Sequence, residues 1–254
     1  MENLYLDSST VPRTYPRPQK RKMNHFRIRV ITIATLLLIV IFTSFTTSFL
    51  YSKPSDTNIT PIEQKNNTID TSSWELMLVN ATHPVDENFY PDLTTLANGN
   101  QVDIKIYPHL QEMFDAARDA GYYPEVTSGY RSTELQQMLY DNEIASYTAQ
   151  GYGYEEAEQL AKGWVAFPGT SEHHTGLAVD ISAAEYSGQS SEEMYPWFME
   201  NCYKYGFILR YPEDKTDITG INYEPWHYRY VGKEVAKEIH EHGICFEEYL
   251  ENAR

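Results

Sequence analysis

Two short clusters of histidine and acidic residues stand out in the second half of the chain. The first, SEHHTGLAVDIS, contains His173 and Asp180, and the second, EPWHYRYVG, contains Glu224 and His227. Imidazole and carboxylate groups are ligands for zinc, and they are also the groups that most often transfer protons in catalysis. Hydrolysis by a metal-activated water is therefore the chemistry that these residue types suggest.

The first cluster can bring two polar side chains to one ion. Gly176 permits a sharp turn into a predicted strand, on which Asp180 shares a face with Ala178 and Ser182 while the alternate residues face the core. His173 lies on the loop that leads into this strand. The plain structural alternatives are a histidine in a turn and an aspartate that caps one.

The second cluster cannot form the H-E-x-x-H helix of many zinc enzymes, because Pro225 excludes a helix interior. On the strand predicted after this proline, His227 and Arg229 share one face. Glu224 lies three residues before His227, so an ideal strand would place their side chains on opposite faces. Both reach one cleft only if the chain bends at Pro225.

If the two clusters meet, His173, Asp180 and His227 supply three ligands. Water would then take the fourth tetrahedral position, which is the arrangement of catalytic zinc. Zinc lowers the pKa of its water to about 7, so Glu224 beside it could act as the general base.

A third cluster, TSGYRS, contains a single cation. Arg131 follows a predicted strand and a turn at Gly129, so its side chain can project over the sheet edge. A guanidinium group there suits a carboxylate or an oxyanion. Pairing with a surface acid is the structural alternative.

The elements that must position these residues indicate an α+β fold with a small, mainly antiparallel sheet flanked by helices and a zinc site in a cleft over the sheet. Hydrophobic periodicity and turn residues predict helices at 108–121, from 133 past 139, and at 154–164, 192–205 and 233–242. The predicted strands are 125–128, 177–181, 207–211 and 226–231.

Charge is distributed unevenly along the 254 residues, whose formal net charge is −16. The first 53 residues contain 8 Lys/Arg and 2 Asp/Glu, which leaves 12 Lys/Arg and 34 Asp/Glu for the remainder. Phosphate backbones repel so acidic a body, and we therefore expect no nucleic-acid partner.

The N-terminal part predicts a single-pass membrane protein. Residues 30–52 have no charged side chain and match the roughly 20 residues of a membrane-spanning helix. The Lys/Arg-rich segment before them should stay in the cytoplasm, which places the acidic body outside it. A cleavable signal peptide is the alternative, although its apolar region would be shorter and no A-x-A-like cleavage site follows. The expected organisation is a basic cytoplasmic tail at 1–29, a transmembrane anchor at 30–52, a polar stalk at 53–73 and a folded domain at 74–254.

The two cysteines, Cys202 and Cys245, have two interpretations. A disulfide is possible in an oxidising compartment. Two independent, small, buried apolar residues are the alternative, and the sequence does not decide between them.

Two motifs match the patterns of one family. S-E-H-H-T-G-L-A-V-D fits S-x-H-x-x-G-x-A-x-D, and the later E-P-W-H fits E-x-W-H. Together with S-G-Y-R they resemble the zinc D-alanyl-D-alanine carboxypeptidases of the VanY type, in the M15 peptidase class. The resemblance runs through nearly the whole domain, from LVNATHPV through GFILRYP to EPWHYRYVG, and two motifs in this order are more specific than either alone.

The resemblance implies roles for particular residues. His173, Asp180 and His227 would hold one Zn²⁺ per domain, and Glu224 would be the catalytic base.

Substrate-contacting roles follow from the same resemblance. Arg131 would hold the substrate carboxylate or the tetrahedral intermediate, and Ser171 and Gln136 would contact the substrate. Gln136 fits a capping box that begins at Thr133 equally well. His174 stands where relatives often have Gln, at a position that is not a ligand in the family.

The implied activity is removal of the terminal D-Ala from the stem peptides of peptidoglycan or their precursors. Such cleavage removes the terminus that glycopeptide antibiotics bind. One alternative is an L,D-carboxypeptidase that acts on tetrapeptide stems. A second is a wall-binding module with a non-catalytic zinc, which would require a missing base or clamp, whereas both Glu224 and Arg131 are present.

Overall fold

The computed structural model describes residues 73–253, which lie within one compact unit, Asn66–Arg254. The predicted tail, the predicted anchor and all but the last residue of the predicted stalk lie outside the described residues. No helix in the described part has the length and apolar character of a membrane span. The first element is a 3₁₀ helix at Trp74–Leu76, where the folded domain was expected to begin.

The centre of the domain is an antiparallel sheet of four strands in the order β3-β4-β6-β5. The four strands are β3 (Pro124–Ser128), β4 (Ala178–Ala183), β5 (Phe207–Leu209) and β6 (His227–Tyr230). All four were predicted, with ends that differ by no more than two residues. A second antiparallel pair, which the sequence analysis missed, consists of β1 (Leu93–Thr95) and β2 (Gln101–Asp103).

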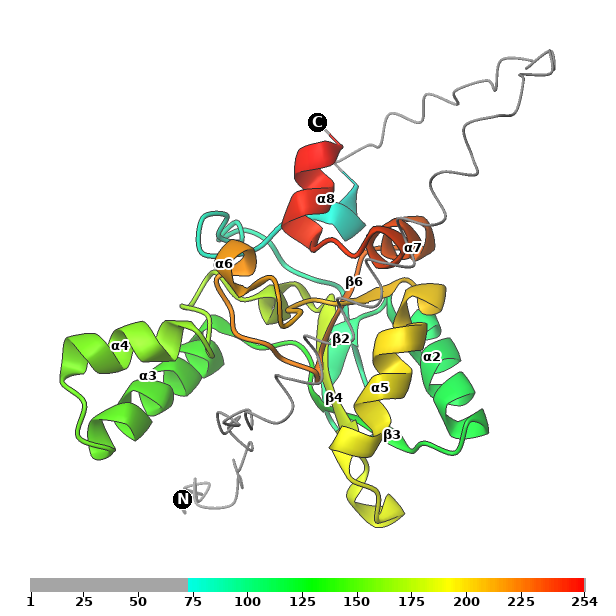
Figure 1. Cartoon of the computed structure of the whole chain (residues 1–254), viewed down its shortest axis with the longest axis horizontal. Coiled ribbons are helices and arrows are strands. Elements are labelled where there is room, and N and C mark those ends of the chain that lie inside the picture. Colours follow the sequence, from blue (N-terminus) through cyan, green and yellow to red (C-terminus); the bar gives the residue numbers. More distant parts are fainter. Residues whose placement is uncertain (1–72, 254) are drawn as a thin grey trace, which may run out of the picture. The chain divides into compact units, whose positions relative to one another are not determined.

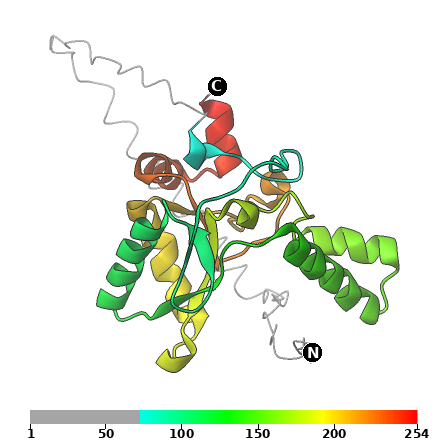
Figure 2. The same cartoon turned by 180° about the vertical axis from the view of Figure 1, so that it is seen from behind.

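Helices flank this sheet, as the α+β prediction requires. They are α2 (Tyr107–Asp119), α3 (Thr133–Ala149), α4 (Tyr154–Lys162), α5 (Ser191–Asn201), α6 (Thr216–Thr219), α7 (Lys233–His242) and α8 (Phe246–Asn252). In Figure 1, α2 and α5 lie beside the sheet, α7 and α8 lie at its upper end, and α3 and α4 form a separate hairpin. Figure 2 shows the same separation from behind.

The two faces of the sheet have different roles. Val179, Ile181 and Tyr228 point into the main core, where α2 and α5 cover them. The strand alternation sends Asp180 and His227 to the opposite face. Helices α7 and α8 cover that second face around β5 and the second half of β6, with a smaller apolar cluster. Part of the second face is thus left for polar side chains.

Three local predictions differ from the structure. Helix α3 is capped by Ser132, whose side chain accepts a hydrogen bond from the amide of Leu135, so the capping box at Thr133 is wrong. Helix α4 ends at Lys162 instead of extending to 164, because Gly163 is its C-cap. The segment predicted as a helix at 192–205 is divided, because α5 ends at Asn201 and a 3₁₀ helix follows at Cys202–Tyr205. Helix α8 was not predicted.

Both cysteines are free and buried. The interpretation of Cys202 and Cys245 as two separate buried residues is the one that the structure supports.

Candidate active site

Strand register brings the two predicted clusters together. Asp180 on β4 pairs directly with His227 on β6, and on its other side it pairs with Ser128 of β3. Directly opposed residues of antiparallel strands point to the same face, with Cβ atoms about 5 Å apart. Nδ1 of His227 lies 3.0 Å from Oδ1 of Asp180.

His173 reaches the same point from a 3₁₀ helix at Glu172–Thr175. Gly176 ends this helix with φ of 69°, and a Cβ atom there would lie 2.8 Å from the amide nitrogen of Asp103. Glycine therefore allows the sharp turn into β4 that the sequence predicts. Nε2 of His173 lies 3.4 Å from Oδ1 of Asp180, and its Nδ1 lies 2.7 Å from the carbonyl oxygen of Gly129.

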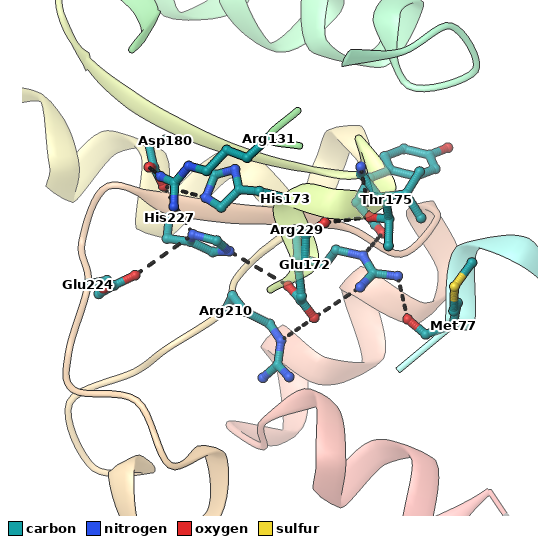
Figure 3. Close-up of polar contacts among 12 residues, drawn as sticks. Met77, Arg131, Glu172, His173, Thr175, Asp180, Arg210, Glu224, His227 and Arg229 are labelled. Atoms are coloured by element: carbon teal, nitrogen blue, oxygen red, sulfur yellow. Dashed lines mark hydrogen bonds and ion pairs between the residues drawn. The ribbon is translucent and has the colours of Figure 1, made fainter. Parts of the chain in front are cut away.

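The bend required at Pro225 is present. The amide of His227 donates to the carbonyl of Glu224 across the turn, at 3.2 Å. The turn brings Oε2 of Glu224 to 3.8 Å from Nδ1 of His227, so both side chains face the same site although they are three residues apart. Figure 3 shows Glu224, His227, His173 and Asp180 converging from three segments.

The three predicted ligands fit a zinc ion. One donor atom from each of His173, Asp180 and His227 lies within 4.8 Å of the other two. Two bonds of about 2.0–2.1 Å at a tetrahedral angle place their donor atoms about 3.3 Å apart, close to the distances seen here. A carbonyl oxygen only accepts, so Nδ1 of His173 carries the proton and its Nε2 is free to bind a metal. The donor set, two imidazoles and a carboxylate, is that of catalytic zinc.

Burial and charge shift the protonation of these groups. Burial raises the pKa of Glu224 to about 8, with Asp180 adding to the effect and His227 opposing it. Burial also lowers the pKa of His173 to about 4. Burial opposes the charge of His227, but the adjacent carboxylates of Asp180 and Glu172 outweigh it and raise the pKa to about 9. A divalent cation would replace that proton, since a histidine ligand must be neutral.

Arg131 lies at the edge of this cluster and is held in place. Its Nη2 is 2.6 Å from Oδ2 of Asp180, and its Nε donates to the hydroxyl of Ser128 at 2.8 Å. Nη1 lies 3.4 Å from Oε1 of Gln136. The partner of Arg131 is thus a predicted metal ligand, and not the surface acid of the structural alternative.

The two other predicted substrate contacts lie nearby. Gln136 is buried and donates to the carbonyl of Ala166 at 2.7 Å, so its side chain links α3 to the loop that follows α4 and does not cap the helix. Ser171 is buried immediately before the 3₁₀ helix that contains His173. Its hydroxyl makes no hydrogen bond with other described residues, and its position suits a substrate contact.

His174 has a supporting role, as predicted for a position that is not a ligand. Its Nδ1 lies 2.8 Å from the carbonyl of Arg131, and its Nε2 accepts from the amide of Gly169 at 3.0 Å. The neutral imidazole thus ties together two loops that border the site.

A buried ionic network that was not predicted from the sequence lies behind His227. Oε1 of Glu172 accepts from Nε of Arg210 at 2.8 Å and from Nη1 of Arg229 at 2.9 Å. Glu247 of α8 binds Arg210 through two further hydrogen bonds. Burial opposes the charge of Glu172, yet the two guanidinium groups hold its pKa well below the usual range. Two arginines in predicted core strands were the available signal, because a buried arginine needs an acidic partner.

Comparison of the sequence with known proteins matches one family. The family profile VanY, described as D-alanyl-D-alanine carboxypeptidase, matches residues 99–233. A D-alanyl-D-alanine carboxypeptidase of Enterococcus faecalis (strain ATCC 700802 / V583) is 52% identical over 181 residues, which cover 71% of this chain and 67% of that one.

Solved structures of similar fold belong to the same family. VanYB in complex with D-alanine-D-alanine has a TM-score of 0.70 and 51% identity, and the match covers 72% of this chain and 100% of that one. A mutant of the vancomycin resistance D,D-pentapeptidase VanY in complex with Zn(II) has a TM-score of 0.69 and 52% identity, covering 70% and 99%. The LD-carboxypeptidase LdcB is more distant, with a TM-score of 0.57 and 39% identity, covering 69% and 85%. On its sequence and on its fold alike, the chain belongs to the VanY family of D-alanyl-D-alanine carboxypeptidases.

Proposed function

We propose that this chain is a zinc-dependent D-alanyl-D-alanine carboxypeptidase that removes the C-terminal D-Ala from peptidoglycan stem peptides. One observation carries the proposal: the donor atoms of His173, Asp180 and His227 converge, with the carboxylate of Glu224 beside them. His173, Asp180 and His227 would hold one Zn²⁺. When bound, the ion supplies a Lewis acid that makes water acidic near neutral pH.

Glu224 is the general base of this proposal. Its carboxylate takes a proton from the attacking water and donates it to the amine nitrogen of the departing D-Ala, so the peptide C–N bond breaks without releasing an unprotonated amine. Burial gives Glu224 a pKa of about 8 in the metal-free site. The positive charge of a bound Zn²⁺ would lower this pKa and favour the carboxylate form that accepts the proton.

Arg131 supplies fixed positive charge at the edge of the site. Its guanidinium is oriented by Ser128 and Asp180, and it retains donors for a carboxylate or for the developing oxyanion. Oriented charge of this kind lowers the barrier because it needs no rearrangement during the reaction. Gln136 and Ser171 line the same region and would contact the substrate.

The L,D-carboxypeptidase alternative differs only in substrate. Greater identity to VanYB than to LdcB favours the D,D-activity. The test is release of D-Ala from a pentapeptide that ends in D-Ala-D-Ala and from the tetrapeptide, with and without a chelator. Chelator-sensitive release from the pentapeptide supports the proposal. Release from the tetrapeptide alone would support the alternative, and chelator-insensitive release would reject zinc dependence.

We also propose an extracytoplasmic location, with residues 30–52 as the membrane anchor. The support is the uncharged apolar stretch and the basic residues before it. Protease treatment of intact and lysed protoplasts that express the full chain tests this. Digestion of the domain only after lysis would reject it.

A further inference from the structure

Glu172 has one fully engaged oxygen and one free oxygen. Oε1 receives both buried guanidinium groups, from Arg210 and Arg229. Oε2 has no hydrogen-bond partner although it is buried. It lies 3.6 Å from Nε2 of His227, and Figure 3 shows the two groups facing each other.

Nε2 of His227 is also buried without a partner. In the described part of the chain only three buried side-chain nitrogen or oxygen atoms lack a hydrogen bond, and two of them are this nitrogen and Oε2 of Glu172. A buried polar atom without a partner costs about 1–3 kcal/mol. An approach of about 0.6 Å would bring the pair to the usual N–H···O distance and remove both penalties.

We propose that Glu172 is a positioning residue that holds His227 with its proton on Nε2, so that the lone pair of Nδ1 points toward His173 and Asp180. In the metal-free site Nδ1 of His227 also faces a carboxylate, that of Asp180. Once Nδ1 binds zinc, the ring proton can lie only on Nε2, where the carboxylate of Glu172 can accept it. Histidine ligands of zinc commonly donate their second N–H to a carboxylate, which fixes the ring and raises its basicity. The inference rests on the proposed function only in that the site binds zinc.

The two arginines explain why this carboxylate can be buried so close to the ligands. Arg229 is tied to the carbonyls of Glu75 and Met77, at 3.0 and 2.8 Å, and Arg210 is bound by Glu247 of α8. Glu172 is therefore held through Arg229 by the N-terminal segment of the domain and through Arg210 by its C-terminal helix. Its free oxygen can relax toward the imidazole without losing either ion pair.

The test compares two variants of the same network. Glu172→Gln removes the charged acceptor that faces His227. Glu247→Gln removes a carboxylate from the same Arg210 but does not contact a proposed ligand, so it controls for general loss of stability. We expect zinc affinity, measured by competition with a chromogenic chelator, to fall about 10–100-fold in Glu172→Gln. It should stay unchanged in Glu247→Gln, although both variants should unfold at lower urea concentration. Equal losses of affinity, or none in Glu172→Gln, would overturn the proposal.

A measurement on the unmodified chain covers the case in which Glu172→Gln does not fold. Long-range ¹H–¹⁵N correlation spectra of the zinc-loaded protein report which nitrogen of each histidine carries the proton. We expect His227 to be protonated at Nε2 and metal-bound at Nδ1, and the reverse assignment would reject the role of Glu172. Neither measurement uses a peptide substrate. A result that rejects the role of Glu172 is therefore distinguishable from a result that rejects the proposed carboxypeptidase activity.

Discussion

Replacing Glu224 with glutamine should affect catalysis and stability in opposite directions. Glutamine keeps the shape of the side chain but cannot take a proton from water. A positioned general base typically contributes 10²–10⁴-fold to the rate, so kcat should fall by about that factor. Zinc content should not change, because Glu224 is not among the three converging ligands.

The stability effect follows from the buried carboxyl. Burial raises the pKa of Glu224 from 4.5 to about 8 in the metal-free protein. Below pH 4.5 the group is protonated in both the folded and the unfolded states. As pH rises from 4.5 to about 8, the unfolded chain ionises first, and the stability that this group contributes is lost progressively. One pKa unit corresponds to 1.36 kcal/mol, so the full loss is at most about 5 kcal/mol.

Glutamine carries no charge, so a protein with glutamine at position 224 does not lose this stability as the pH rises. Urea denaturation in the presence of a chelator should show Glu224→Gln more stable than the unmodified protein at pH 9, by up to about 5 kcal/mol, and by less than about 1 kcal/mol at pH 5. An equal difference at both pH values would refute the burial argument. Unchanged turnover would reject Glu224 as the base, and loss of zinc would make it a ligand instead.

Three further substitutions test the surroundings of the site. His174→Gln should keep activity, because an amide can donate and accept the same two hydrogen bonds, whereas His174→Leu should lose about 1–3 kcal/mol of stability for each buried group left unpaired, measured by urea denaturation. Arg131→Lys should lower kcat/KM about 10–100-fold at full zinc content, since an ammonium cannot replace the guanidinium fork, and retained activity would remove Arg131 from the site. Gly176→Ala should destabilise the protein by about 1–3 kcal/mol, because alanine is strained at φ of 69° and its Cβ would meet the amide of Asp103. An unchanged denaturation midpoint would show that the turn tolerates a side chain.

The sequence predicted the elements that depend on local patterns. The helix predicted at 108–121 from hydrophobic periodicity is α2, which buries a stripe that consists of Leu110, Met113, Phe114 and Ala117. The four sheet strands were predicted because apolar runs between turn residues are local signals. Helix α8 was missed since its seven residues alternate acidic and apolar types too briefly to show a period.

The sequence by itself determined which residue types were available for chemistry: two histidines and an aspartate for a metal, a glutamate for proton transfer and an arginine for an anion. Ligand chemistry and short motifs are properties of neighbouring residues, so these assignments needed no coordinates.

Only the tertiary structure decided how those residues meet. Segments far apart in the chain are joined by the pairing of Asp180 with His227 and by the ion pairs of Glu172. The turn that directs Glu224 toward the same site departs from ideal strand geometry. Register and side-chain direction depend on long-range packing, which a single sequence does not display. For that reason the sequence does not distinguish Glu172 from a surface carboxylate. The buried guanidinium groups of Arg210 and Arg229 around it are visible only in the structure.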